Sequence, residues 1–161
     1  MRSTKSPKWI GSDSSNPSGA NALRRLGISP HSLRAVTPEL LKSVLNGIAD
    51  NARVHIHVAE QTKEVDDCVA WSGQRPVEFL LDQFDVSDRW CAIHATHMTG
   101  CETQRLAKSE AVAGLCPTTE ANLGDGIFPA DHFMKQGGAI AIGSDSQITI
   151  SPAEDLRMLE Y

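Results

Sequence analysis

The sequence has no excess of positive charge and no long apolar run. Its 15 Lys and Arg residues are outnumbered by 20 Asp and Glu, which gives a formal net charge of −5. Non-specific binding to nucleic acid needs a basic face for the phosphates. No apolar run approaches the roughly 18 residues of a membrane helix, and the start lacks the apolar segment of a secretory signal. We therefore expect no nucleic-acid or membrane partner, and a cytoplasmic location.

The cysteines also lack the spacing of a metal or redox motif. No Cys-x-x-Cys pair occurs among Cys68, Cys91, Cys101 and Cys116, and three of the four lie among apolar residues. Buried thiols in a reducing compartment are therefore a better interpretation than a disulfide framework. The length of 161 residues is typical of one domain with a substantial core.

Residues 1–22 differ in composition from the rest of the chain. They are rich in Ser, Pro and Gly and show no period of a helix or a strand. Such a segment cannot bury enough apolar surface to offset the entropy lost on ordering. We expect an irregular or disordered head over residues 1–22, followed by one folded domain over residues 23–161.

From Leu26 onward, short apolar runs alternate with segments of helical pattern. The runs are nearly continuous in hydrophobicity, as in strands buried on both faces of a parallel sheet. The predicted strands cover residues 26–28, 53–59, 90–95, 111–116 and 138–145. Alternation of strand and helix predicts right-handed crossovers and an α/β architecture.

Capping residues mark where the intervening helices begin. Thr37, with the proline that follows it, precedes a segment with one apolar face, Thr62 is expected to cap the next helix, and Pro76 opens a third. Thr99 and Ser151 each precede a Glu by three residues, which is the spacing of a capping box.

Histidines and charged residues follow four of the five predicted strands. Ligands of parallel α/β sheets gather at the carboxyl ends of the strands. Each residue alone has a simpler interpretation, since a lone His is more often structural and Gly-Ser-Asp is usually a turn. Burying several imidazoles and carboxylates together without a metal or mutual pairing would be costly, which favours a shared site. The candidates are His31, Arg34, His57, Glu60, His94 and Asp145; the run Cys116 to Glu120 after the fourth strand is polar but less diagnostic.

His57 and Glu60 form the most specific pair. An imidazole nitrogen can bind a divalent metal, and a nearby unligated carboxylate can take a proton from water on that metal. Asp145 could add an oxygen ligand, and His94 could hydrogen-bond a water or a tetrahedral centre. The sequence holds no G-x-S-x-G elbow, Walker loop or G-x-G-x-x-G, which argues against covalent hydrolases and nucleotide-binding proteins.

Together these residues resemble the amidohydrolase superfamily, whose members are metal-dependent (β/α)8 barrels that hydrolyse or deaminate C–N bonds. His57 and Glu60 resemble its fifth-strand His-x-x-Glu, His94 its sixth-strand histidine and Asp145 its eighth-strand aspartate. The flanking sequences are similar to those of the formimidoylglutamate deiminases of bacterial histidine degradation. This second similarity rests on residues 30–39, 55–61 and 116–126.

The resemblance implies a role for each residue. His57 and Asp145 would bind zinc, with iron or manganese as alternatives, and Asp145 would also accept a proton from the attacking water. Glu60 would carry protons to the formimino nitrogen, and His94 would assist the water and the tetrahedral intermediate.

The substrate implied is a small amidine that bears a carboxylate, N-formimidoyl-L-glutamate, which water would convert to N-formyl-L-glutamate and ammonia. His31 and Arg34 would contact this substrate, because a guanidinium matches a carboxylate bidentately. Two alternatives remain: an aminohydrolase for a purine, pyrimidine or guanidino compound, and a non-catalytic fragment.

One element of the superfamily has no counterpart here. The first-strand His-x-His is missing, because the only such motif, His55/His57, belongs to the fifth-strand pattern. We therefore expect a partial (β/α)8 TIM-type barrel holding roughly strands four to eight. Two protein ligands would hold zinc loosely, so we expect the chain alone to be poorly active. Exposed strand edges predict a homo-oligomer or a need for the missing half of the barrel.

Overall fold

The computed structural model describes residues 26–146, 148 and 150–160. The head predicted for residues 1–22 lies outside the described residues. No helix in the described ranges combines the length and the apolar composition that crossing a bilayer requires.

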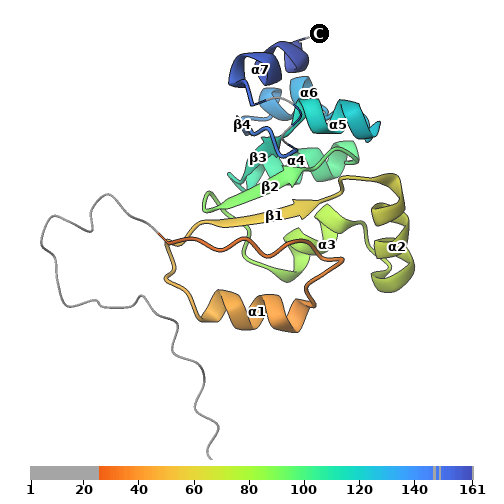
Figure 1. The fold of residues 1–161 in the computed structure, drawn as a ribbon. Coiled ribbons are helices and arrows are strands. Elements are labelled where there is room, and N and C mark those ends of the chain that lie inside the picture. Colours follow the sequence, from red (N-terminus) through yellow and green to blue (C-terminus); the bar gives the residue numbers. More distant parts are fainter. Residues whose placement is uncertain (1–25, 147, 149, 161) are drawn as a thin grey trace, which may run out of the picture.

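Four parallel strands form one sheet in which spatial order follows chain order. They are β1 (Val54–Val58), β2 (Trp90–His94), β3 (Val112–Leu115) and β4 (Ala139–Ile142), each hydrogen-bonded to the next (Figure 1). Each lies within a strand predicted from the sequence. Because all four strands are parallel, their carboxyl ends share one rim of the sheet.

The predicted first strand, residues 26–28, is wrong as a regular strand. Isolated parallel bridges pair Ile28 with Val54 and Ser32 with His57, so this segment runs alongside β1 without forming a ladder. Pro30 lies between the two bridges and has no N–H to donate, which interrupts the hydrogen-bond pattern.

Helices follow the strands in the order expected from the capping residues. The Thr37 hydroxyl accepts a hydrogen bond from the Leu40 N–H, and Thr99 forms a reciprocal capping box with Glu102. Thr62 was expected to be a cap but is the first helical residue, because Gln61 occupies the cap position. Ser151 directly precedes the last helix. The helices are α1 (Pro38–Asn46), α2 (Thr62–Ser72), α3 (Pro76–Gln83), α4 (Gly100–Lys108), α5 (Pro117–Leu123), α6 (Ala130–Lys135) and α7 (Pro152–Glu160).

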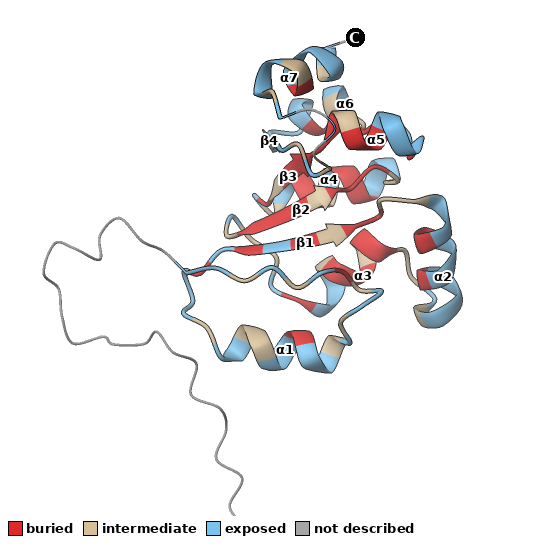
Figure 2. Ribbon diagram, viewed as in Figure 1, coloured by how far each residue is buried: buried red, intermediate tan, exposed pale blue. Residues whose placement is uncertain are grey.

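At β1, only one face of the sheet is fully buried in the described structure. Val54, Ile56 and Val58 of β1 join the core with residues of α1, α3 and α4, whereas His55 on the opposite face is exposed (Figure 2). The expectation that strands are buried on both faces is therefore wrong for β1, because the helices pack against one face alone. The open face corresponds to the interior of a closed barrel.

Candidate functional site

Five of the predicted site residues gather where β1 and β2 end. The rings of His31 and His57 stack with centroids 4.9 Å apart, and those of His57 and His94 lie 5.5 Å apart. Arg34 Nη2 donates to Glu60 Oε2 at 2.8 Å, and the other oxygen of Glu60 lies 3.7 Å from His94 Nε2. The structure thus brings together imidazoles, a carboxylate and a guanidinium from three separate segments of the chain.

The hydrogen bond of His57 decides which of its nitrogens is free. Its Nδ1 lies 2.7 Å from the carbonyl oxygen of His31. A carbonyl oxygen only accepts, so Nδ1 carries the proton and Nε2 keeps an unshared electron pair. Histidines that bind metals in proteins are commonly held in this way, with the second nitrogen donating to a carbonyl or carboxylate. His57 is therefore prepared to act as a ligand through Nε2.

Backbone turns at the strand ends aim the functional side chains. Four of the five non-glycine residues with positive φ in the described residues lie at the carboxyl ends of strands: Ala59, His94, Ala95 and Asp145, with φ between 49° and 65°. This region is strained for residues that have a Cβ, and such strain persists where the surrounding structure fixes it. The concentration of strain at one rim indicates a functional site there.

Glu64 fixes the turn that carries Glu60. This carboxylate, in the first turn of α2, is buried and accepts the backbone N–H groups of Ala59 at 3.1 Å and Glu60 at 2.9 Å. Its Oε2 also lies 4.0 Å from Arg34 Nε. Sequence reasoning did not identify Glu64, although its position four residues after Glu60 in a first helical turn is a usable signal.

His94 is enclosed by carboxylates. Its side chain is buried, and Nδ1 lies 3.1 Å from Glu120 Oε1. Burial alone would lower the pKa of His94, but the hydrogen bond to Glu120 and the charges of Glu60, Glu120 and Asp145 outweigh it, so the pKa is raised. The imidazolium form is thus stabilised in this site.

Asp145 lies on the same rim, in the exposed loop after β4. Its negative charge contributes to the raised pKa of both His94 and Cys116. Thr119 of α5 holds this loop: its hydroxyl donates to the Ser144 carbonyl at 3.1 Å and accepts the Ser146 N–H at 3.1 Å. The loop is fastened on both sides of Asp145.

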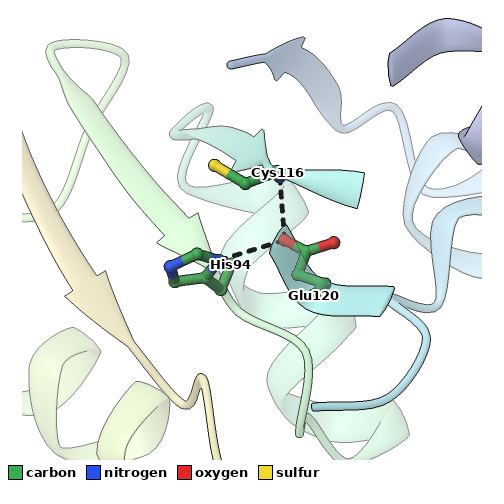
Figure 3. A group of neighbouring side chains, drawn as sticks. All are labelled: His94, Cys116 and Glu120. Atoms are coloured by element: carbon green, nitrogen blue, oxygen red, sulfur yellow. Dashed lines mark hydrogen bonds and ion pairs between the residues drawn. The ribbon is translucent and has the colours of Figure 1, made fainter. Parts of the chain in front are cut away.

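A buried cluster behind the site joins His94, Cys116 and Glu120. One potential ligand atom from each lies within 4.8 Å of the others. Figure 3 shows the sulfur of Cys116 pointing away from the Glu120 carboxylate, whose Oε1 accepts the Cys116 N–H at 2.8 Å as well as His94 Nδ1. Burial, with nearby carboxylates, raises the pKa of Cys116 to about 12, so its sulfur is a neutral thiol. Two hydrogen bonds to Glu120 hold these three residues together.

The cysteine environments predict selective alkylation. Cys68, Cys91 and Cys116 are buried and their pKa values are raised by burial, whereas Cys101 is exposed on α4. Because the thiolate is the nucleophile, we expect iodoacetamide at neutral pH to modify Cys101 alone in the folded chain. Peptide mass spectrometry measures this, with all four sites modified in denaturant as the control. Rapid native modification of Cys116 would contradict the structure.

Comparison with known proteins identifies the family. Residues 18–160 match the Amidohydrolase family. The chain belongs to the amidohydrolase family. Its relatives include the formimidoylglutamate deiminase of Pseudomonas aeruginosa, 57% identical over 136 residues, which are 84% of this chain and 30% of that protein. A 5-methylthioadenosine/S-adenosylhomocysteine deaminase of Natronomonas pharaonis is 32% identical over 127 residues, 75% of this chain and 28% of that protein.

Solved amidohydrolase structures share the fold. An amidohydrolase from Brucella melitensis superimposes with a TM-score of 0.82 at 62% identity, covering 84% of this chain and 30% of that one. An adenosine deaminase from Xanthomonas campestris with bound zinc gives 0.75 at 27% identity, covering 82% and 31%. This chain thus spans about 30% of the length of these relatives. The predicted family and the partial barrel are confirmed.

Proposed function

We propose that this site serves the metal-dependent hydrolysis of N-formimidoyl-L-glutamate to N-formyl-L-glutamate and ammonia. The observation that carries the proposal is the placement of Glu60 between Arg34 and His94, next to a histidine with a free Nε2. The 57% identity to a formimidoylglutamate deiminase supports the choice of substrate.

Two residues have the donor chemistry of a divalent metal site. His57 offers an imidazole nitrogen and Asp145 a carboxylate oxygen, both suited to zinc. When bound, such a metal lowers the pKa of water and supplies a nucleophile near neutral pH. Because catalytic zinc sites usually have three protein ligands, we expect further ligands from outside the described residues in the active enzyme.

Protons move through the chain's own side chains. Addition of water to the amidine carbon forms a C–O bond, the formimino nitrogen gains protons, and the C–N bond then breaks to release ammonia. Glu60 has one oxygen held by Arg34 and one directed at His94, so it can accept a proton from water and deliver it to the leaving nitrogen. His94 Nε2 is buried and has no hydrogen-bond partner among the described residues, so the reacting oxygen would supply the partner that it lacks.

Arg34 connects substrate binding with Glu60. Its contact with Glu60 uses Nη2, and its side chain is 37% exposed, so a carboxylate arriving from solvent can reach the guanidinium. The substrate carboxylate would then compete with Glu60 or share Arg34 with it. His31 stacks on His57 and lies beside this position.

The experiment that tests the function uses a chimaera. Residues 26–160 replace the matching segment of the P. aeruginosa formimidoylglutamate deiminase, which supplies the remainder of the barrel. We expect zinc-dependent release of ammonia from N-formimidoyl-L-glutamate at about the parent rate, and little from 5-methylthioadenosine. A folded, zinc-loaded chimaera that deaminates only the nucleoside would reject the proposed substrate and favour the alternative aminohydrolase.

Arg34→Ala tests the carboxylate contact. Hydrogen bonds to charged groups contribute about 1.5–3 kcal/mol, so KM for N-formimidoyl-L-glutamate should rise by roughly 10- to 150-fold. Steady-state kinetics of the chimaera measure this change. Arg53→Ala, which removes an exposed arginine paired with Asp88 at the opposite end of β1, is the control and should leave KM unchanged. Equal KM values for Arg34→Ala and Arg53→Ala would show that Arg34 does not bind the substrate.

A further inference from the structure

Glu120 concentrates two hydrogen bonds on one oxygen. The N–H of Cys116, at the end of β3, and Nδ1 of His94, at the end of β2, both reach Oε1, at 2.8 and 3.1 Å (Figure 3). All three residues are buried. The Pro117–Leu123 helix begins directly after Cys116, and the Glu120 N–H donates to the Cys116 carbonyl in its first turn. The side chain is thereby directed back toward the strand ends.

An ionised carboxylate accepts hydrogen bonds and donates none. A proton must therefore lie on Nδ1 of His94, which leaves Nε2 of the neutral ring bare. Nε2 is buried, has no partner among the described residues, and lies 3.7 Å from Glu60 Oε1. This distance is too long for a direct hydrogen bond, but both acceptors can contact a donor placed between them, such as a water molecule.

We propose that Glu120 is a positioning residue for His94, holding the tautomer whose bare Nε2 accepts a hydrogen bond from the attacking water beside Glu60. The proposal deepens the proposed function and rests on it. Histidines that exchange protons in enzymes are commonly oriented by a carboxylate on the far nitrogen. If a proton then reaches Nε2, the imidazolium is flanked by two carboxylates and can donate to the developing tetrahedral oxygen.

The tautomer of the wild-type chain gives the first test. The full chain, labelled with 15N-histidine and freed of metal, is observed by long-range 1H–15N correlation at mildly alkaline pH, with a His94→Asn variant for assignment. We expect the nitrogen shifts of His94 to show a protonated Nδ1 and an unprotonated Nε2. The reverse pattern, or an equal mixture of tautomers, would overturn the proposal without any variant of Glu120.

Two substitutions separate positioning from helix capping. Glu120→Ala removes the acceptor, so His94 should populate the Nε2-protonated tautomer, whereas Glu120→Gln keeps a carbonyl oxygen and should retain the wild-type pattern. Glu154→Ala, which removes a glutamate from the first turn of α7, should change nothing at His94. If the His94 spectrum is unchanged in a folded Glu120→Ala variant, Glu120 does not position His94 and only caps the helix. Should the alanine variant not fold, the wild-type tautomer still decides.

Kinetics of the chimaera connect the tautomer with catalysis. Outer partners of catalytic groups typically matter 10- to 100-fold, so Glu120→Ala should lower kcat by about that factor while KM and zinc content stay constant, with partial recovery in Glu120→Gln. If the chimaera is active and Glu120→Ala leaves its kcat unchanged, the positioning role is overturned and the proposed function stays intact. Suppose instead that His94 has the expected tautomer but the chimaera does not hydrolyse the substrate. This result would overturn both the proposed function and the catalytic role of the tautomer. Glu120 would still set the tautomer of His94.

Discussion

Replacing His57 with alanine is expected to abolish both zinc binding and ammonia release in the chimaera. The hydrogen bond of His57 Nδ1 to the His31 carbonyl leaves Nε2 of the same ring available to bind a metal. A catalytic metal contributes several kcal/mol of stabilisation, and each 1.4 kcal/mol is a factor of about ten, so the rate should fall by at least about a thousandfold. Metal analysis after exhaustive dialysis should show a decrease from about one zinc per chain to a small fraction.

His55→Ala provides a matched control for this result. His55 lies two residues earlier in the same strand, on the same face, and is exposed. Its backbone N–H, which bonds to the Ile28 carbonyl, survives the substitution. We expect zinc content and rate to remain within about twofold of the unsubstituted chimaera, since the exposed His55 side chain makes no hydrogen bond or ion pair with the site among the described residues. Equal zinc retention by both variants would mean that His57 is not a ligand, and would favour the non-catalytic interpretation.

The same measurement applies to the chain by itself. Within the described residues, His57 and Asp145 are the two side chains proposed to bind the metal, and two protein ligands hold zinc more weakly than three. We expect less than stoichiometric zinc after dialysis of the isolated chain and slow release of ammonia. In the isolated chain, the sheet face that carries the exposed His55 is open to solvent, so the site is open to water from that side.

The sequence predicted which residues lie together better than it predicted the contacts that hold them in place. His57, Glu60 and His94 could be grouped because parallel strands bring their carboxyl ends together, which requires only strand order and direction. The ion pair of Arg34 with Glu60 and the hydrogen bond of His94 to Glu120 each join residues 26 positions apart. Such pairs depend on how turns aim side chains, and strained positions such as Ala95 carry no sequence signal.

The regular elements show the same division. The starts of α1 and α3 followed from Pro38 and Pro76, whose rings favour a first helical turn. The segment at Ile28 was apolar enough to suggest a strand, but Pro30 limited it to isolated bridges. Here a local covalent property, the missing N–H, outweighed hydrophobic pattern, and the irregular edge places His31 beside β1.

A buried glutamate outside the site should contribute strongly to stability. Glu102 completes the capping box of α4 through the Thr99 N–H at 2.8 Å, as the sequence predicted. The structure adds partners that the sequence did not indicate: Arg75 Nε donates to it at 2.7 Å and the Glu78 N–H at 3.3 Å. Arg75 also donates to the His97 carbonyl, so this one carboxylate joins α3, α4 and the loop after β2.

Glu102→Ala should therefore destabilise the chain by about 3 kcal/mol, at the lower end for a buried ion pair because Arg75 is 31% exposed. It leaves a half-buried cation and two N–H groups without an acceptor. The expected decrease in Tm, measured by calorimetry, is roughly 6–12 °C. Glu154→Ala is the control, since Glu154 occupies the equivalent position three residues after Ser151 and pairs with Arg157 in solvent. That exposed pair should contribute less than about 1 kcal/mol. Similar decreases in Tm for the two variants would show that the burial of Glu102 and its ion pair with Arg75 contribute no stability beyond that of a helix cap.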